Sequence, residues 1–238
     1  MQPLSAERIL AVWETGRPQH ALDRALTLLA AALPGVSRDA LADLSIGERD
    51  ARLLQLRALV LGSRAEGFAE CPGCAERVEF PLDTAAFLAG RAQPRPPAHQ
   101  EIETHGRKIA FRLPTSRDLA AVVTAPDSAE ALHHLVEACL LEAHDTKLPN
   151  EAIEALSRAM LAADPQAETT LHLTCPVCAQ EWETFLEISE FFWTEIAAQA
   201  QRLLREIDAL ARAYGWTERE ILGLPAQRRQ TYLELIAA

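Results

Sequence analysis

Residues 71–74 read Cys-Pro-Gly-Cys and residues 175–178 read Cys-Pro-Val-Cys, so one short motif occurs twice, 104 residues apart. The residues after each motif also align at this offset, for example Leu82 with Leu186. Two thiolates separated by two residues point at one metal ion from a tight turn, and two such turns complete a tetrahedral site. We therefore predict the two halves of one zinc ribbon, whose ligands are Cys71, Cys74, Cys175 and Cys178.

Disulfide bonds and a redox dithiol are the alternative interpretations of a Cys-x-x-Cys pair. A redox dithiol opens a helix in a strand–helix unit, whereas polar, β-prone segments flank both pairs here. Five cysteines in 238 residues fit a reducing compartment better than a disulfide-stapled secreted domain. Zinc is the preferred interpretation, and the other two stay open. Because four thiolates leave no open coordination position, one zinc ion here would be structural and not catalytic.

The composition predicts a mainly α protein with a small β component. Hydrophobic residues make up 49% of the chain and aromatic residues 5%, and alanine and leucine dominate. The 14 prolines fall mostly between segments of helical periodicity. The fold class we predict is a helical domain plus a split four-cysteine zinc ribbon that carries an α+β insertion.

Start and stop signals divide the chain into regions. Ser45 and Glu48 form a capping box that opens a helix, and the proline cluster at 91–98 is typical of a stiff connector. We predict N-terminal helices in 1–66, the two ribbon halves in 67–90 and 168–187, an insertion of a hairpin and helices in 91–167, and a long helix with two short helices in 188–238. The ribbon would act as a clasp that seats the insertion and brings the N-terminal helices near the long C-terminal one.

The long helix, about 188–213, carries apolar residues at alternating spacings of three and four, from Trp193 to Tyr214. This seam is typical of a coiled coil or of a helix that lies in a groove. We prefer packing on the N-terminal helices, because three heptads are short for an independent coiled coil.

A formal charge of −11 and a pI near 5.1 argue against non-specific nucleic-acid binding, which needs a basic surface. The N-terminus lacks the basic start and apolar stretch of a signal peptide, and no run approaches the roughly 20 apolar residues of a membrane span. We expect a soluble protein in the cytoplasm or in an assembled particle.

The sequence shows no nucleophile–base pair, phosphate-binding loop or open metal site, so we predict that the protein is not an enzyme. His133 and Glu137, four residues apart on a predicted helix, are compatible with a metal or a proton relay, but an ordinary solvated helix face is the preferred interpretation. The same holds for His172 and for residues 144–145. Cys139 lies in an apolar helical run and is interpreted as a small buried residue.

The chain resembles the T4-type phage baseplate proteins, whose members accompany contractile tails and contractile injection systems. The two Cys-Pro-x-Cys motifs and the tail at 213–222 carry the resemblance most specifically. Residues 13–16, 21–29, 46–57 and 228–233 support it. The resemblance implies a baseplate or hub assembly chaperone, or a minor baseplate component, that contacts a baseplate or hub/spike subunit and performs no chemistry of its own.

The partner surface cannot be transferred from that family residue by residue. Large aromatic residues are scarce elsewhere but concentrate near the C-terminus, which predicts a contact surface there or a C-terminal core. The candidate residues are Trp193, Leu203, Tyr214, Trp216, Arg228, Arg229 and Tyr232. An acidic protein partner or an internal ion pair is expected for the two arginines. A zinc-ribbon regulator that binds nucleic acid and a hydrolase that uses His133 are the alternative functions.

Overall fold

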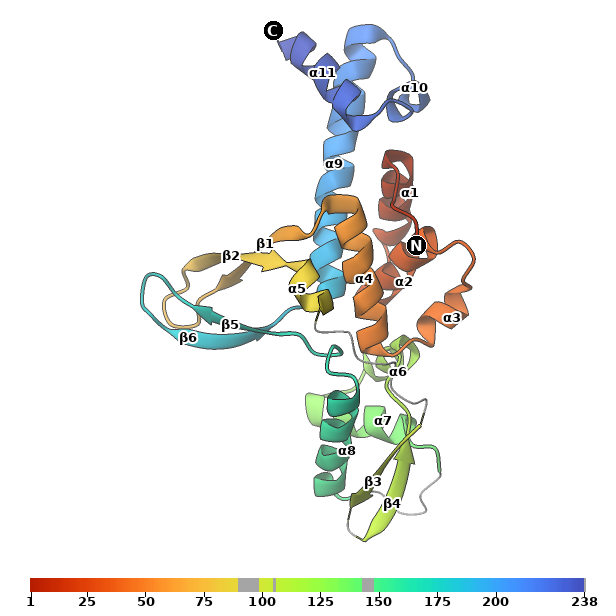
Figure 1. The fold of residues 1–238 in the computed structure, drawn as a ribbon, viewed down its shortest axis with the longest axis vertical. Coiled ribbons are helices and arrows are strands. Elements are labelled where there is room, and N and C mark those ends of the chain that lie inside the picture. The colour runs from red at the N-terminus through yellow and green to blue at the C-terminus, as the bar shows by residue number, and fades with distance from the viewer. Residues whose placement is uncertain (90–98, 105, 143–147, 238) are drawn as a thin grey trace.

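The computed structural model describes residues 1–89, 99–104, 106–142 and 148–237. Of these residues 57% are helical and 17% lie in small sheets, which confirms the predicted fold class. A helical body occupies the centre of the molecule (Figure 1). A double hairpin projects from one side, the insertion lies at one end, and the C-terminal helices lie at the other. The proline cluster at 91–98, the predicted turn residue His105 and residues 144–145 fall outside the described residues.

The helical body consists of four N-terminal helices and the first half of the long C-terminal one. Serine side chains cap three of them: Ser5, Ser37 and Ser45 each accept a hydrogen bond from a backbone N–H three residues later. The Glu48 carboxylate pairs with Arg52 at 2.7 Å. The five helices are α1 (Ala6–Gly16), α2 (Ala21–Ala32), α3 (Arg38–Ala42), α4 (Ile46–Leu61) and α9 (Ile188–Tyr214).

Helix α9 closes the body core. Phe192, Ile196 and Leu203 are fully or almost fully buried among leucines of the N-terminal helices, which confirms that this part of the predicted seam packs internally. Arg57 of α4 donates two hydrogen bonds to the Glu195 carboxylate of α9, at 2.9 and 2.7 Å. Such a bidentate pair with a buried guanidinium fixes how the two helices lie against each other.

The arm, residues 64–83 and 170–185, consists of two antiparallel hairpins. Strand β1 (Arg64–Glu70) pairs with β2 (Arg77–Asp83), and β5 (Thr170–Thr174) pairs with β6 (Glu181–Phe185). Each Cys-Pro-x-Cys motif forms the turn of one hairpin, at the end of the arm farthest from the body (Figure 1). A short helix, α5 (Thr84–Ala89), follows β2 and lies against α4.

The insertion folds around its own core. Strands β3 (Gln100–Thr104) and β4 (Arg107–Phe111) form a hairpin, followed by α6 (Ser116–Val122), α7 (Ser128–Ala138) and α8 (Asn150–Ala163). Phe111, Ile153 and Leu156 are its largest buried side chains. Helix α7 ends at Ala138, because the backbone N–H of Leu141 donates a hydrogen bond to the carbonyl of Ala110 and extends the hairpin.

The head, residues 206–237, contains the second half of α9, α10 (Glu218–Leu222) and α11 (Ala226–Ala237). Gly215 ends α9 in the left-handed conformation, at φ 68°, and Thr217 and Glu220 form a capping box at the start of α10. Both short helices pack on α9 beyond the end of α1 (Figure 1). In the described part of the chain, no helix has an apolar stretch that would cross a bilayer.

Candidate metal centre

The two cysteine turns have the same local geometry. The backbone N–H groups of Cys71 and Cys175 donate to the carbonyls of Glu76 and Gln180, at 2.8 and 2.9 Å. Ala75 and Ala179 occupy the left-handed region, with φ of 58° and 59°, and are the two non-glycine residues with positive φ among the described ones. Each turn thus curls back on itself and directs both of its sulfur atoms to the same side.

The four sulfur atoms face one another across the two turns. Sγ atoms of Cys71 and Cys178 lie 3.6 Å apart, as do those of Cys74 and Cys175, and all four lie within 4.8 Å of one another. Zinc–sulfur bonds of about 2.3 Å place the sulfurs of a regular tetrahedron about 3.8 Å apart. The observed spacing therefore fits a four-thiolate metal site, which the 104-residue repeat predicted.

Backbone N–H groups stabilise negative charge on the buried sulfurs. Gly73 and Val177 donate to Sγ of Cys71 and Cys175, each at 3.4 Å. A hydrogen bond from the Cys178 backbone and these neighbouring donors lower the pKa of Cys175 to about 7. At Cys74 a backbone hydrogen bond from Glu76 lowers the pKa, but contacts with Cys178 and the other sulfurs outweigh it and raise the pKa to about 12. Four crowded sulfurs do not all ionise without a cation, and a divalent ion supplies the missing charge.

The alternatives to a metal fit this geometry less well. All five cysteines are free thiols, and sulfurs 3.6 Å apart are far from the roughly 2.05 Å of a disulfide bond. Each short distance also joins the two turns and not the two cysteines of one turn. A redox dithiol sits at a helix N-terminus, whereas both pairs here lie in hairpin turns.

The site lies at the tip of the arm and away from both large cores. Its cysteines pack only with Val78 and Trp182 in a separate small cluster. The interpretation of the ribbon as a clasp that brings the N-terminal helices near the long C-terminal one stays a prediction, because α1, α2 and α4 contact α9 directly and without the cysteines. The body is joined through α4, α9 and their ion pair, because helices bury far more apolar surface than two short hairpins do.

The candidate partner residues fall into two groups. Trp193, Leu203 and Arg229 are buried, and Arg229 pairs with Glu206 at 3.0 Å inside the head. Tyr214, Trp216 and Tyr232 come together on the head surface, where the Tyr214 and Trp216 rings stack at 4.6 Å and Tyr232 lies edge-on to both. Arg228 is exposed beside them. The head thus presents an aromatic cluster supported by an internal ion pair.

The histidines do not form a second site in the described residues. His133 Nδ1 lies 3.9 Å from Glu137, and its Nε2 is 3.0 Å from the Asn150 side chain. His172 pairs with Glu183 on the arm at 3.2 Å. Among the described residues, the four cysteines alone form a cluster with metal-ligand spacing.

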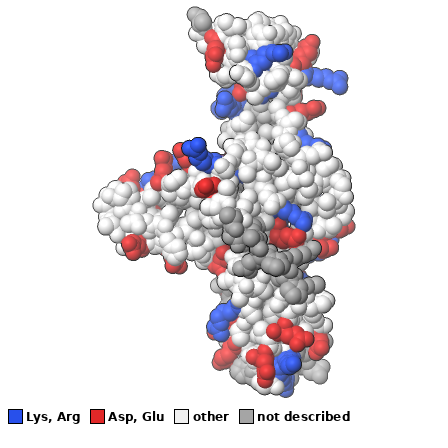
Figure 2. Space-filling view, viewed as in Figure 1, with Lys and Arg blue, Asp and Glu red and all other residues white. Residues whose placement is uncertain are grey.

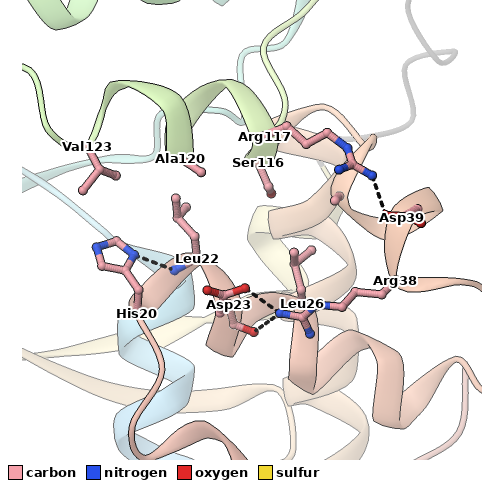
Figure 3. A pocket seen from close by; sticks show the side chains of 11 residues that line it. His20, Leu22, Asp23, Leu26, Arg38, Asp39, Ser116, Arg117, Ala120 and Val123 are labelled. Atoms are coloured by element: carbon pink, nitrogen blue, oxygen red, sulfur yellow. Dashed lines mark hydrogen bonds and ion pairs between the residues drawn. The ribbon is translucent and has the colours of Figure 1, made fainter.

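A hollow of about 350 Å³ lies between α2, α3 and α6 (Figure 3). Its two arginines already have partners: Arg38 contacts Asp23 at 2.6 Å, and Arg117 contacts Asp39 at 2.6 Å. The Arg117 guanidinium also contacts Asp43 at 2.7 Å. The Arg117 pairs join the insertion to the body, whereas the Arg38 pair joins α3 to α2 within the body. Together these pairs leave the lining of the hollow close to neutral.

Comparison with known proteins identifies one family. The family model described as T4 bacteriophage base plate protein matches residues 4–193, which include the four N-terminal helices of the body, the arm and the insertion. The match ends within α9, so the whole head lies beyond it. Neither a curated protein nor a solved structure matches the chain.

Proposed function

Because the chain belongs to the T4 bacteriophage base plate protein family, we propose that it acts as a non-enzymatic assembly factor or minor component of the baseplate or hub of a contractile tail or contractile injection system. The observation that carries this proposal is the extent of the family match. It covers 190 of 238 residues and includes the N-terminal helices, the arm and the insertion.

The metal centre supports a scaffold role. Four thiolates fill a tetrahedral shell, so a zinc ion held by Cys71, Cys74, Cys175 and Cys178 offers no open position to a substrate. Its binding free energy would stabilise the arm, because the two hairpin turns hold together mainly through the metal. The protein would then act through surfaces that its scaffold positions.

The head supplies a surface suited to a protein partner. Aromatic side chains carry much of the binding energy at protein interfaces, and Tyr214, Trp216 and Tyr232 lie together next to exposed Leu235 and Ile236. We infer that these residues and Arg228 contact a baseplate or hub subunit. Trp193, Leu203 and Arg229 hold the head and body in shape and would act indirectly.

Deletion of the gene tests the function. The number of complete contractile particles should fall in the absence of the protein and recover when the wild-type gene is restored. Mass spectrometry of purified particles then separates a permanent component, which remains in them, from a chaperone, which does not. Full particle yield without the protein would refute the assembly role.

The head surface has its own variant. Trp216→Ala should reduce particle yield without changing the helical circular dichroism of the purified protein, because Trp216 is half-buried in a surface cluster. Leu161→Ala, at an exposed leucine of α8, is the matched control and should have no effect.

A further inference from the structure

The outer face of the β1–β2 hairpin is an unpartnered sheet face with an exposed aromatic residue at its centre. The register places Phe68 opposite Glu79, Glu66 opposite Pro81 and Glu70 opposite Arg77, so these side chains share one face. The other face carries Val78 and Leu82, which are buried. Phe68 is 60% exposed, which is unusual for a phenylalanine in a strand that already has a buried face.

Carboxylates surround this phenylalanine. Glu66 and Glu70 are its neighbours on the same face of β1, and Glu79 lies directly across on β2; all three are exposed. The 36 residues of the arm carry seven Asp or Glu and two Arg, a net charge of −5, so the other 202 residues carry −6 of the total −11. Four thiolates around a divalent ion would add two more negative charges. The arm therefore holds nearly half of the net negative charge in a small part of the chain. In the view of Figure 2 a few acidic side chains lie along the edges of the arm.

One contact shows which chemistry this face accepts. The Arg77 guanidinium lies over the Phe68 ring at 4.0 Å from its centroid. A ring flanked by carboxylates attracts a cation through its π face and through the neighbouring charges. With 60% of the side chain exposed, Phe68 still offers surface to a second cationic or aliphatic side chain.

We propose that the outer face of the β1–β2 hairpin binds a basic surface of a baseplate subunit, in which a Lys or Arg side chain of the partner contacts Phe68 between Glu66 and Glu79. The choice of partner rests on the proposed function. Nucleic acid is repelled by this charge. A second copy of the chain is a poorer match in charge, because the residues outside the arm are also net acidic.

The position of the metal centre agrees with this role. The site orders the tip of a projecting arm whose residues contribute little to either large core. An arm of this kind presents a surface, and the metal fixes the shape of that surface. Removal of the metal should therefore weaken binding of the partner while the body remains folded.

The test measures binding to baseplate subunits isolated from cells that lack the protein. Wild-type, metal-loaded protein is compared with Glu66→Gln/Phe68→Ala/Glu79→Gln by co-sedimentation at low and high NaCl. The control, Glu7→Gln/Glu14→Gln/Leu161→Ala, removes two carboxylates and one apolar side chain from exposed positions on α1 and α8. Metal content and helical circular dichroism must match the wild type in both variants, which shows that the arm is folded.

We expect the arm variant to bind at least about tenfold more weakly than the wild type, because central aromatic and charged contacts dominate interface energies. Binding of the wild type should weaken as the NaCl concentration rises. A photo-crosslinking phenylalanine analogue in place of Phe68 should join a partner segment rich in Lys and Arg. If the arm variant bound as tightly as the wild type, or if the crosslink joined Phe68 to an acidic segment, this inference would be overturned. The assembly role would still stand. Wild-type protein that neither binds baseplates nor is needed for particles would overturn both.

Discussion

The carboxylate of Asp164 accepts a hydrogen bond of 2.9 Å from the backbone N–H of Gly47, which lies 117 residues earlier in the chain. Gly47 is in the first turn of α4, so Asp164 satisfies an N–H group that the helix itself leaves without a partner. The adjacent N–H of Ile46 donates to the carbonyl of Pro114 at 3.1 Å. Two segments of the insertion, at Pro114 and at Asp164, thus meet the body at the start of one helix.

Replacement of Gly47 tests this junction. A Cβ atom at Gly47 would lie 2.7 Å from Cγ of Asp164 and 2.9 Å from the backbone nitrogen of Ala167, too close for either group. Gly47→Ala should therefore lower the free energy of unfolding by about 1 to 3 kcal/mol, as overpacking does. Asp164→Ala should lower it by about 1 to 2 kcal/mol through loss of the helix cap. Urea denaturation measures both.

Gly35→Ala is the matched control for the first variant, because a Cβ atom at Gly35 meets nothing within 4 Å. Equal stability of Gly47→Ala and Gly35→Ala would contradict a close junction between insertion and body.

The sequence predicted the elements on each side of this junction but not the junction itself. The periodicity of 150–163 and the serine before Ile46 mark α8 and α4 through local contacts, which neighbouring residues determine. Nothing near Asp164 indicates Gly47 as its partner, because long-range hydrogen bonds leave no periodic pattern. A buried aspartate just beyond a helix is the one signal available, and burial is itself known only from the fold.

The metal centre was likewise predictable from the sequence only in part. A doubled Cys-x-x-Cys motif predicts the ligand set, because the spacing within each turn fixes how two sulfurs point. The position of the site in the fold depends on how the hairpins project from the body, which no residue of the turns encodes.

Loss of a metal ligand should therefore have a local effect. We expect about one zinc ion per wild-type chain by elemental analysis, and far less in Cys175→Ser. Hydrogen exchange should rise in residues 64–83 and 170–185 of the variant, while α4, α8 and α9 keep their protection, because none of their core contacts involves the cysteines.

Cys139→Ser is the control for Cys175→Ser, because it removes a cysteine that is not a proposed metal ligand. Cys139 is fully buried in the insertion, where burial raises the pKa of its thiol to about 12. This variant should retain its zinc. Zinc loss in Cys139→Ser would contradict the assignment of ligands. In the wild type, a chelator that removes the metal should expose the other four cysteines to thiol reagents at neutral pH, while Cys139 should stay unreactive.

Substitution of the left-handed alanines in the two turns should stabilise the metal site. Ala75 and Ala179 have φ near 60°, which costs an L-residue with a Cβ atom about 1 kcal/mol or more relative to glycine. Ala75→Gly and Ala179→Gly should relieve part of this strain, offset by the greater freedom of glycine in the unfolded arm. Zinc affinity, measured by competition with a chromogenic chelator, should rise by up to about fivefold per substitution, since folding and metal binding are linked.

Ala86→Gly is the control for these variants. Ala86 is exposed in the helix α5, where the backbone has no positive φ that glycine would relieve. It should leave zinc affinity unchanged or lower it. Weaker zinc binding in both turn variants would show that the alanine side chains stabilise the turns.

The ion pair of Arg112 with Asp118 should make the insertion sensitive to acid. Burial raises the pKa of Asp118, but hydrogen bonds from Arg112, at 2.6 and 2.8 Å, and from Thr115 outweigh it, so the pKa lies below its ordinary value of 3.8. A depressed pKa contributes stability at pH values above 3.8, and this contribution is lost as pH falls through the lower pKa of the folded state. Asp118→Asn should thus be less stable than the wild type at pH 7, and the two should converge below about pH 4. Chemical denaturation in the presence of EDTA measures this difference without a contribution from acid release of metal, and a gap of constant size from pH 7 to pH 3 would contradict the assignment.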